Sequence, residues 1–139
     1  SKLNVNAESC SNHFIQHAMV DAMQADQSGS KQILSTLKKR RDTAVDGLNN
    51  ISGISLAKPN STFYLFPNVT KVMESKGFSS IEQLQIGALE NSGVSFCTRN
   101  HFGRPSPAEN EYFIRFAYSG IGVSDIRESL HKLKLYFEN

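Results

Sequence analysis

Tyr112-Phe113-Ile114-Arg115-Phe116-Ala117-Tyr118 is the stretch of this 139-residue chain that most strongly indicates its fold. Apart from Arg115 the stretch is apolar or aromatic, and large apolar residues of this kind favour strands. Because the side chains of a strand alternate, Ile114 and Phe116 lie on one face and Arg115 lies on the opposite one. The stretch therefore predicts a strand with one apolar face and one face that carries a cation.

The clearest helix of the chain follows this strand. Ser124 is placed to cap it. Its apolar residues are spaced 3, 4, 3 and 4 along the sequence, which is the spacing of one helical face: they are Val123, Ile126, Leu130, Leu133 and Phe137. On the other side of the strand, a loop with Gly103 and two prolines separates it from residues 94–97, a second candidate strand.

Two elements are predicted in the middle of the chain. Residues 62–66 are rich in aromatic side chains and bounded by prolines, which predicts another strand. Ser79 and Glu82 have the spacing of a capping box at the start of a helix that Gly93 closes.

Two helices are predicted before these elements. Residues 11–25 form the first, capped by Ser11 or Asn12. The second is longer and ends before Gly53. Its apolar stripe consists of Ile33, Leu34, Leu37, Ala44, Val45 and Leu48. The order of elements predicts an α/β sandwich in which helices pack on a small mixed sheet.

Length and composition limit the class of protein. A mass of 15.4 kDa suits one compact domain, and 39% hydrophobic with 20% charged residues is an ordinary globular mixture. The formal charge, 15 − 13 = +2, requires neither a nucleic acid nor an anionic membrane as a partner. No apolar run is long enough to span a bilayer, and no secretory signal is recognisable, so we expect no membrane association.

Cysteine content and the first residues give two further expectations. Cys10 and Cys97 cannot form a disulfide framework, which favours a reducing, cytoplasmic location. The chain opens on Ser1 rather than on methionine, which is compatible with an excerpt from a longer protein.

Arg115 is the residue that fits its surroundings least. A buried guanidinium needs an anionic partner, because an unpaired buried charge costs several kcal/mol. Composition favours an ion pair with one of the 13 acidic residues. The alternative is an anionic ligand, since the guanidinium fork matches a carboxylate or phosphate.

Other candidate residues have a less specific pattern. His13 and His17 could share a metal ion, although solvated or core histidines are the better interpretation. The basic run of residues 38–41 could contact phosphates, but a solvated helix face is favoured. Cys97 has no nearby residue that would mark it as a nucleophile, so we interpret it as a small core residue.

Several segments together resemble the C-terminal, small domain of the fold-type I, pyridoxal-phosphate-dependent aminotransferases, in the class of aspartate and aromatic aminotransferases. The similarity covers essentially the whole chain. The segments are residues 14–23 (the helix after the cofactor-binding core), 40–42 (the helix that joins the domains), 59–64 (P-x-G-x-F-Y), 89–94 (L-L-E-x-x-G-V), 102–103 (F-G) and 114–118 (the isoleucine–arginine strand).

The resemblance implies a role for Arg115, because the matching arginine of the family binds the α-carboxylate of the amino-acid substrate. It also implies an activity, the transfer of an amino group between an L-amino acid, aspartate-like or aromatic, and a 2-oxo acid. Pyridoxal 5'-phosphate would be the cofactor, and a homodimer the state of the full-length protein.

The chain departs from the family pattern at two places. Ser61 replaces the glycine of P-x-G-x-F-Y, and Thr98-Arg99 replaces the Pro-Gly that precedes F-G. The second change puts a cation in a loop that commonly approaches the active-site mouth. We therefore hypothesise that Arg99 helps to select an acidic substrate side chain, the alternative being a solvent-exposed loop arginine.

The resemblance also implies how the chain divides. Residues 1–27 match the C-terminal edge of the large, cofactor-binding domain, and residues 28–139 match the connecting helix with the small domain. The lysine that holds the cofactor precedes this region in the family, so we expect a lid and a carboxylate site without transamination by the chain alone. The alternative is a stand-alone, non-catalytic carboxylate-binding module.

Overall fold

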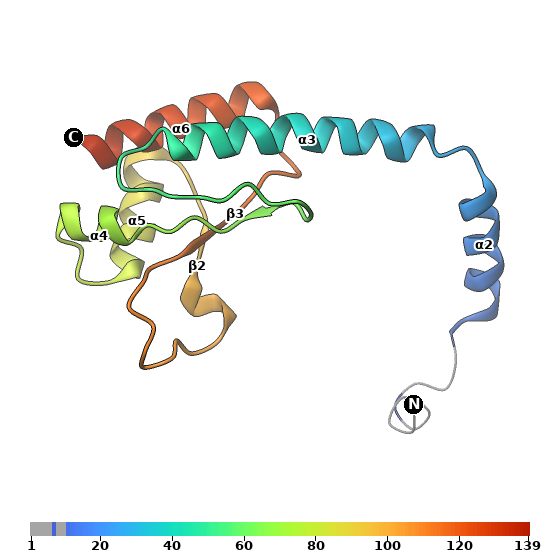
Figure 1. Cartoon of the computed structure of the whole chain (residues 1–139), viewed down its shortest axis with the longest axis horizontal. Coiled ribbons are helices and arrows are strands. Elements are labelled where there is room, and N and C mark those ends of the chain that lie inside the picture. Colours follow the sequence, from blue (N-terminus) through green and yellow to red (C-terminus); the bar gives the residue numbers. More distant parts are fainter. Residues whose placement is uncertain (1–6, 8–10) are drawn as a thin grey trace. The chain divides into compact units, whose positions relative to one another are not determined.

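The computed structural model describes residue 7 and residues 11–139. The prediction for Cys10 lies outside these residues. The chain divides into two compact units, Ser1–Leu34 and Ser35–Asn139, and the boundary in the sequence falls within the residues of α3 (Ser28–Asn49). Figure 1 labels most of the elements of both units.

The first unit contains α2 (His13–Gln24), and α3 begins in it. Asn12 rather than Ser11 caps α2, since its Oδ1 accepts the backbone N–H of Phe14 at 3.3 Å. At the start of α3, Asp26 Oδ1 accepts the backbone N–H of Ser28, the first residue of that helix, at 3.1 Å. The two helices predicted for the first part of the sequence are thus confirmed, and side-chain hydrogen bonds fix where each begins.

The second unit holds a three-stranded sheet in the order β1-β3-β2. Its strands are β1 (Tyr64–Leu65), β2 (Cys97–Thr98) and β3 (Ile114–Ala117). Both pairings are antiparallel, so the expectation of a mixed sheet is wrong for the strands that the structure describes. The strands are also shorter than predicted, although bonds such as Tyr118 N–H to Phe63 O, at 3.1 Å, continue the pairing beyond them.

Four further helical segments complete this unit: α4 (Thr70–Lys76), α5 (Ile81–Ser92), the 3-10 turn η1 (Arg99–Phe102) and α6 (Val123–Glu138). Helix α4 is not predicted from the sequence. Two predicted caps are wrong by one or two positions. Ser80, not Ser79, caps α5 by accepting the backbone N–H of Gln83, and Gly122, not Ser124, precedes the first turn of α6.

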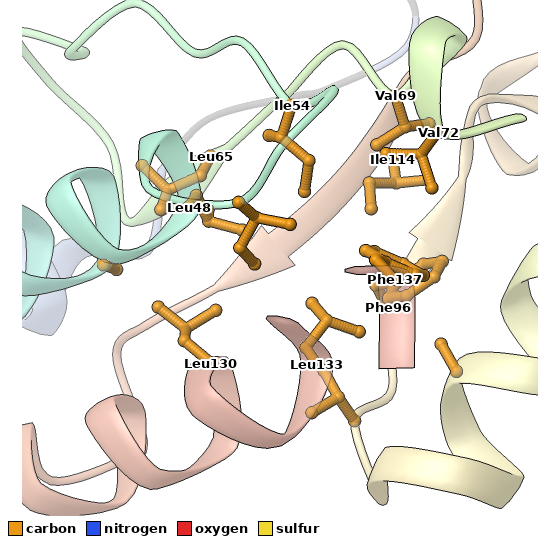
Figure 2. Packing of buried hydrophobic residues seen from close by; sticks show 14 of the residues in the cluster. Leu48, Ile54, Leu65, Val69, Val72, Phe96, Ile114, Leu130, Leu133 and Phe137 are labelled. Carbon is orange, nitrogen blue, oxygen red and sulfur yellow. The ribbon is translucent and has the colours of Figure 1, made fainter. Parts of the chain in front are cut away.

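The register of the sheet separates its two faces. Leu65 lies opposite Phe116, and Thr98 lies opposite Ile114, so these four side chains share one face. This face packs on a single hydrophobic cluster to which the helices contribute, and Figure 2 shows Ile114 beside Val69 and Val72 of that cluster. The predicted α/β fold class, with helices packed on a small sheet, is confirmed.

The opposite face of the sheet carries Tyr64, Cys97, Arg115 and Ala117, which the same register pairs. The first three are half-buried and Ala117 is exposed. The alternation predicted for residues 112–118 is therefore correct, and the fold leaves Arg115 on the side of the sheet away from the hydrophobic cluster.

Thr62, just before β1, is the non-glycine residue with a positive φ, 66°, among those the structure describes. A β-branched residue in this region is strained by about 1–2 kcal/mol, because its Cβ crowds the backbone. Tyr118 helps to hold Thr62 in this conformation, because its hydroxyl donates a hydrogen bond to Thr62 O at 2.6 Å.

Replacing Thr62 by glycine should therefore raise the free energy of unfolding by about 0.5–1 kcal/mol, measured by urea denaturation. Ser61→Gly is the matched control at the neighbouring position, where no positive φ is found. It should lower stability slightly, because glycine adds entropy to the unfolded chain. Equal effects of the two substitutions would show that Thr62 is not strained.

Candidate functional site

The guanidinium of Arg115 lies between two aromatic rings. Its central carbon is 4.3 Å from the ring centroid of Tyr64 and 4.6 Å from that of Phe102. The rings come from opposite sides of the central strand, since Tyr64 belongs to β1 and Phe102 follows β2. Both contacts are cation–π interactions, which attract a cation to the ring face.

The polar contacts of Arg115 are few. Its Nη2 lies 3.6 Å from Cys97 Sγ, which is a weak acceptor. None of the ion pairs between residues that the structure describes includes Arg115, so the predicted structural ion pair finds no support there. The guanidinium is thus placed to donate in-plane hydrogen bonds to an added anion, and a carboxylate matches its fork.

Arg99 has a different environment. Its Nε and Nη2 lie 2.9 Å and 3.1 Å from the two carboxylate oxygens of Glu109, a bidentate ion pair between half-buried side chains. Its Nη1 donates to Gly103 O at 3.2 Å. Arg99 therefore ties the turn η1 to the loop that follows it, rather than extending freely from an exposed loop.

The turn that presents Phe102 is held at two more points. Thr98 is fully buried, and its hydroxyl lies 2.9 Å from His101 Nδ1. Asn100 Nδ2 donates to Glu82 Oε1 on α5 at 2.7 Å, and this bond is the main cause of the lowered pKa of Glu82.

A cleft of about 490 Å³ lies beside the turn. Its polar lining includes Arg99, Asn100, Glu82, Glu109 and Glu111.

The basic run of residues 38–41 is divided between two roles. Lys38 and Lys39 are exposed, as a solvated helix face requires. Arg40 and Arg41 are half-buried and donate to backbone carbonyls, those of Ser119 and Pro59. The solvated-face interpretation is therefore correct for the two lysines and wrong for the two arginines, which anchor α3 to neighbouring loops.

Asp42 completes this anchor. Its Oδ1 lies 2.8 Å from Lys58 Nζ and 2.9 Å from Arg41 Nε. The hydrogen bond from Lys58, and then that from Arg41, holds the pKa of Asp42 below its ordinary value. The Asp42–Lys58 ion pair fixes the loop that leads into β1. It therefore supports the strand that carries Tyr64.

The remaining candidates occupy ordinary positions. Cys97 is half-buried and faces Arg115, so its interpretation as a core residue is wrong.

The rings of His13 and His17 lie edge to face, 4.7 Å apart. In the part of the chain that the structure describes, no three His, Cys, Asp or Glu side chains gather as a metal site would require. Nor does any helix described there combine the length and apolarity of a membrane span.

The fold and the site together define a two-layer α/β domain with an arginine on the sheet face opposite its hydrophobic cluster. The sequence model of the family "aminotransferase class I and II" matches residues 3–133. The chain belongs to this family, which confirms the resemblance drawn from the motifs.

A sequence relative agrees with this assignment, and two solved structures share the fold. The asparagine–oxo-acid transaminase of Streptococcus mutans is 29% identical over 123 residues, covering 88% of this chain and 30% of the relative. The structure of the aspartate aminotransferase from Rhizobium meliloti has a TM-score of 0.74 at 24% identity, covering 98% of this chain and 34% of that one. The alanine aminotransferase from Pyrococcus furiosus has a TM-score of 0.76, also at 24% identity, with 93% and 30% covered. The chain thus spans about a third of the length of these relatives.

Proposed function

We propose that this chain is the C-terminal portion of a pyridoxal-phosphate-dependent transaminase that moves an amino group between an L-amino acid, aspartate-like or aromatic, and a 2-oxo acid. In this proposal Arg115 binds the α-carboxylate of the substrate. The observation that carries it is a half-buried guanidinium held between two rings, for which no carboxylate of the described residues serves as a partner. A substrate carboxylate would supply the missing anion.

The cofactor belongs, in this proposal, to a large domain of which this chain contains only the edge. The cation–π and hydrogen-bond partners described for Arg115 are two rings and a thiol, and none of them is the amine that would hold pyridoxal phosphate covalently. The residues around Arg115 therefore do not fit the cofactor by themselves. Residues 1–27 would be the edge of the large domain, and residues 28–139 the connecting helix with the small domain.

The same proposal covers the assembly and location of the parent protein. We expect a homodimer in the cytoplasm, with amino acids and 2-oxo acids as its ligands and neither a nucleic acid nor a membrane as a partner. The chain alone would bind a carboxylate at most. A stand-alone carboxylate-binding module is the alternative, favoured by the fact that residues 35–139 enclose a hydrophobic cluster of their own.

Amino transfer by the full-length protein with added pyridoxal phosphate tests the proposal. Aspartate and phenylalanine should be offered as donors, each beside its α-carboxamide, with 2-oxoglutarate as acceptor. We expect transfer from at least one free amino acid and a loss of about 100-fold or more in kcat/KM for its carboxamide, which lacks the anion that Arg115 would bind. Carboxylate binding without any transfer would instead support the binding module.

Arg99 is proposed to select an acidic substrate side chain, which would have to compete with Glu109 for its guanidinium. Arg99→Ala should then reduce the kcat/KM for aspartate relative to phenylalanine by about tenfold or more, since a charge-assisted hydrogen bond contributes about 1.5–3 kcal/mol. Arg104→Ala, at an exposed arginine of the same loop, is the control and should leave this ratio unchanged.

The partner residue provides a second, opposite readout. Glu109→Gln removes the competing carboxylate, so it should increase the preference for aspartate. If Arg99→Ala and Glu109→Gln both change the two donors equally, Arg99 holds the turn but does not select substrates.

A further inference from the structure

We infer that Tyr64 and Phe102 are positioning residues, which hold the guanidinium of Arg115 so that its N–H groups are directed at a substrate carboxylate. The inference rests on the proposed function of Arg115 and adds two residues to that site. Neither ring touches the carboxylate in this arrangement. Each acts through the arginine.

The geometry follows from the shape of the guanidinium. Its five N–H bonds lie in one plane, while its two faces are free of hydrogen-bond donors. In the proposed arrangement the two rings, whose centroids lie 4.3 Å and 4.6 Å from the central carbon, cover these faces and leave the N–H bonds for a carboxylate. Because one ring comes from β1 and the other from the turn after β2, the side chain is limited on both sides of its own strand.

The rings are not explained by core packing. Phe102 remains 46% exposed, and Tyr64 is half-buried on the sheet face away from the hydrophobic cluster. Phe102 is kept in place by its turn, through the Arg99–Glu109 ion pair and the Asn100–Glu82 hydrogen bond. Phe102 buries little apolar surface, and polar contacts of its turn hold it in place. Its position is therefore better explained by its contact with Arg115 than by apolar packing.

Ordering the arginine in advance should strengthen binding. A long arginine side chain carries much rotamer entropy, and a side chain that is already confined loses less of it when a ligand arrives. The rings also partly replace the water that would otherwise solvate the cation. Both effects act on an anionic ligand and neither acts on a neutral one of the same shape.

The test measures ligand affinity by calorimetry in the full-length protein loaded with pyridoxal phosphate. The probes are two unreactive carboxylates, succinate and 3-phenylpropionate. The neutral controls are succinamide and 3-phenylpropionamide, in which every carboxylate is replaced by a primary amide. Tyr64→Leu and Phe102→Leu keep an apolar side chain of similar bulk but remove the ring. We expect each to weaken carboxylate binding by about 3- to 30-fold and to leave amide binding unchanged.

Conservative variants separate positioning from folding. Tyr64→Phe and Phe102→Tyr retain the ring faces, so they should bind the carboxylates as tightly as the unchanged protein. Equal weakening of carboxylate and amide by the leucine variants would overturn the inference, because it would show a merely structural role.

If the proposed function of Arg115 is wrong, the variants should show a different pattern of carboxylate and amide binding. Arg115→Gln should abolish the preference for carboxylate over amide. If Arg115→Gln does so while both leucine variants retain the full preference, the positioning role is overturned and the carboxylate site stands. If Arg115→Gln has no effect on the preference, the proposed function itself is wrong.

Discussion

Replacing Arg115 by glutamine in the full-length protein is expected to lower kcat/KM for its amino-acid donor by about 100-fold or more. Removing one partner of a partly desolvated charge pair costs about 2–5 kcal/mol, because the other charge then lacks its hydrogen bonds. Glutamine preserves a polar side chain of moderate length, so the substitution removes charge and fork geometry without emptying the site.

Two further variants identify which property of Arg115 matters. Arg115→Lys keeps the charge but provides neither a planar fork nor the same contact with Tyr64 and Phe102, so it should recover only part of the lost activity. Arg127→Gln makes the same charge change at an exposed position of α6 and should leave kcat/KM unchanged.

Steady-state kinetics with a free amino acid and its carboxamide completes the comparison. Arg115→Gln should reduce the rate with the free amino acid and affect the carboxamide little. A loss of the same size with both donors would mean that Arg115 does not bind the α-carboxylate.

Local sequence signals predicted the helices better than the strands. Helix bounds depend on residues close in sequence, as when Asn12 caps α2 or Gly93 adopts its positive φ of 71° after α5. The short helix α4 escaped because seven residues with two buried side chains, Val72 and Met73, show no recognisable period. The strands of this sheet pair with distant segments, so their lengths and directions are set by contacts that no local window contains.

The same distinction holds for the candidate site. A lone cation in an apolar strand is visible in the sequence, and Arg115 was singled out on that ground. Its neighbours could not be found in this way, because Tyr64 and Phe102 reach it only through the pairing of β3 with β1 and β2. The Arg99–Glu109 pair spans a loop without regular structure, for which the sequence provides no spacing rule.

Leu133 is the most deeply buried residue of α6. Its side chain is fully buried, within the hydrophobic cluster that supports the inner face of the sheet (Figure 2). Leu133→Ala removes apolar contacts and leaves a cavity that the surrounding side chains fill only in part. We therefore expect the free energy of unfolding to fall by about 2–5 kcal/mol.

Leu135 provides a matched control on the same helix, because it is 49% exposed and undergoes the same change in size. Leu135→Ala should change stability by no more than about 0.5 kcal/mol, since alanine also favours the helix. Urea denaturation followed by circular dichroism measures both variants. Similar losses for the two would mean that α6 does not face the cluster through Leu133. A large loss at Leu133 alone would show that the layer beneath β3, and with it the strand that carries Arg115, depends on this helix.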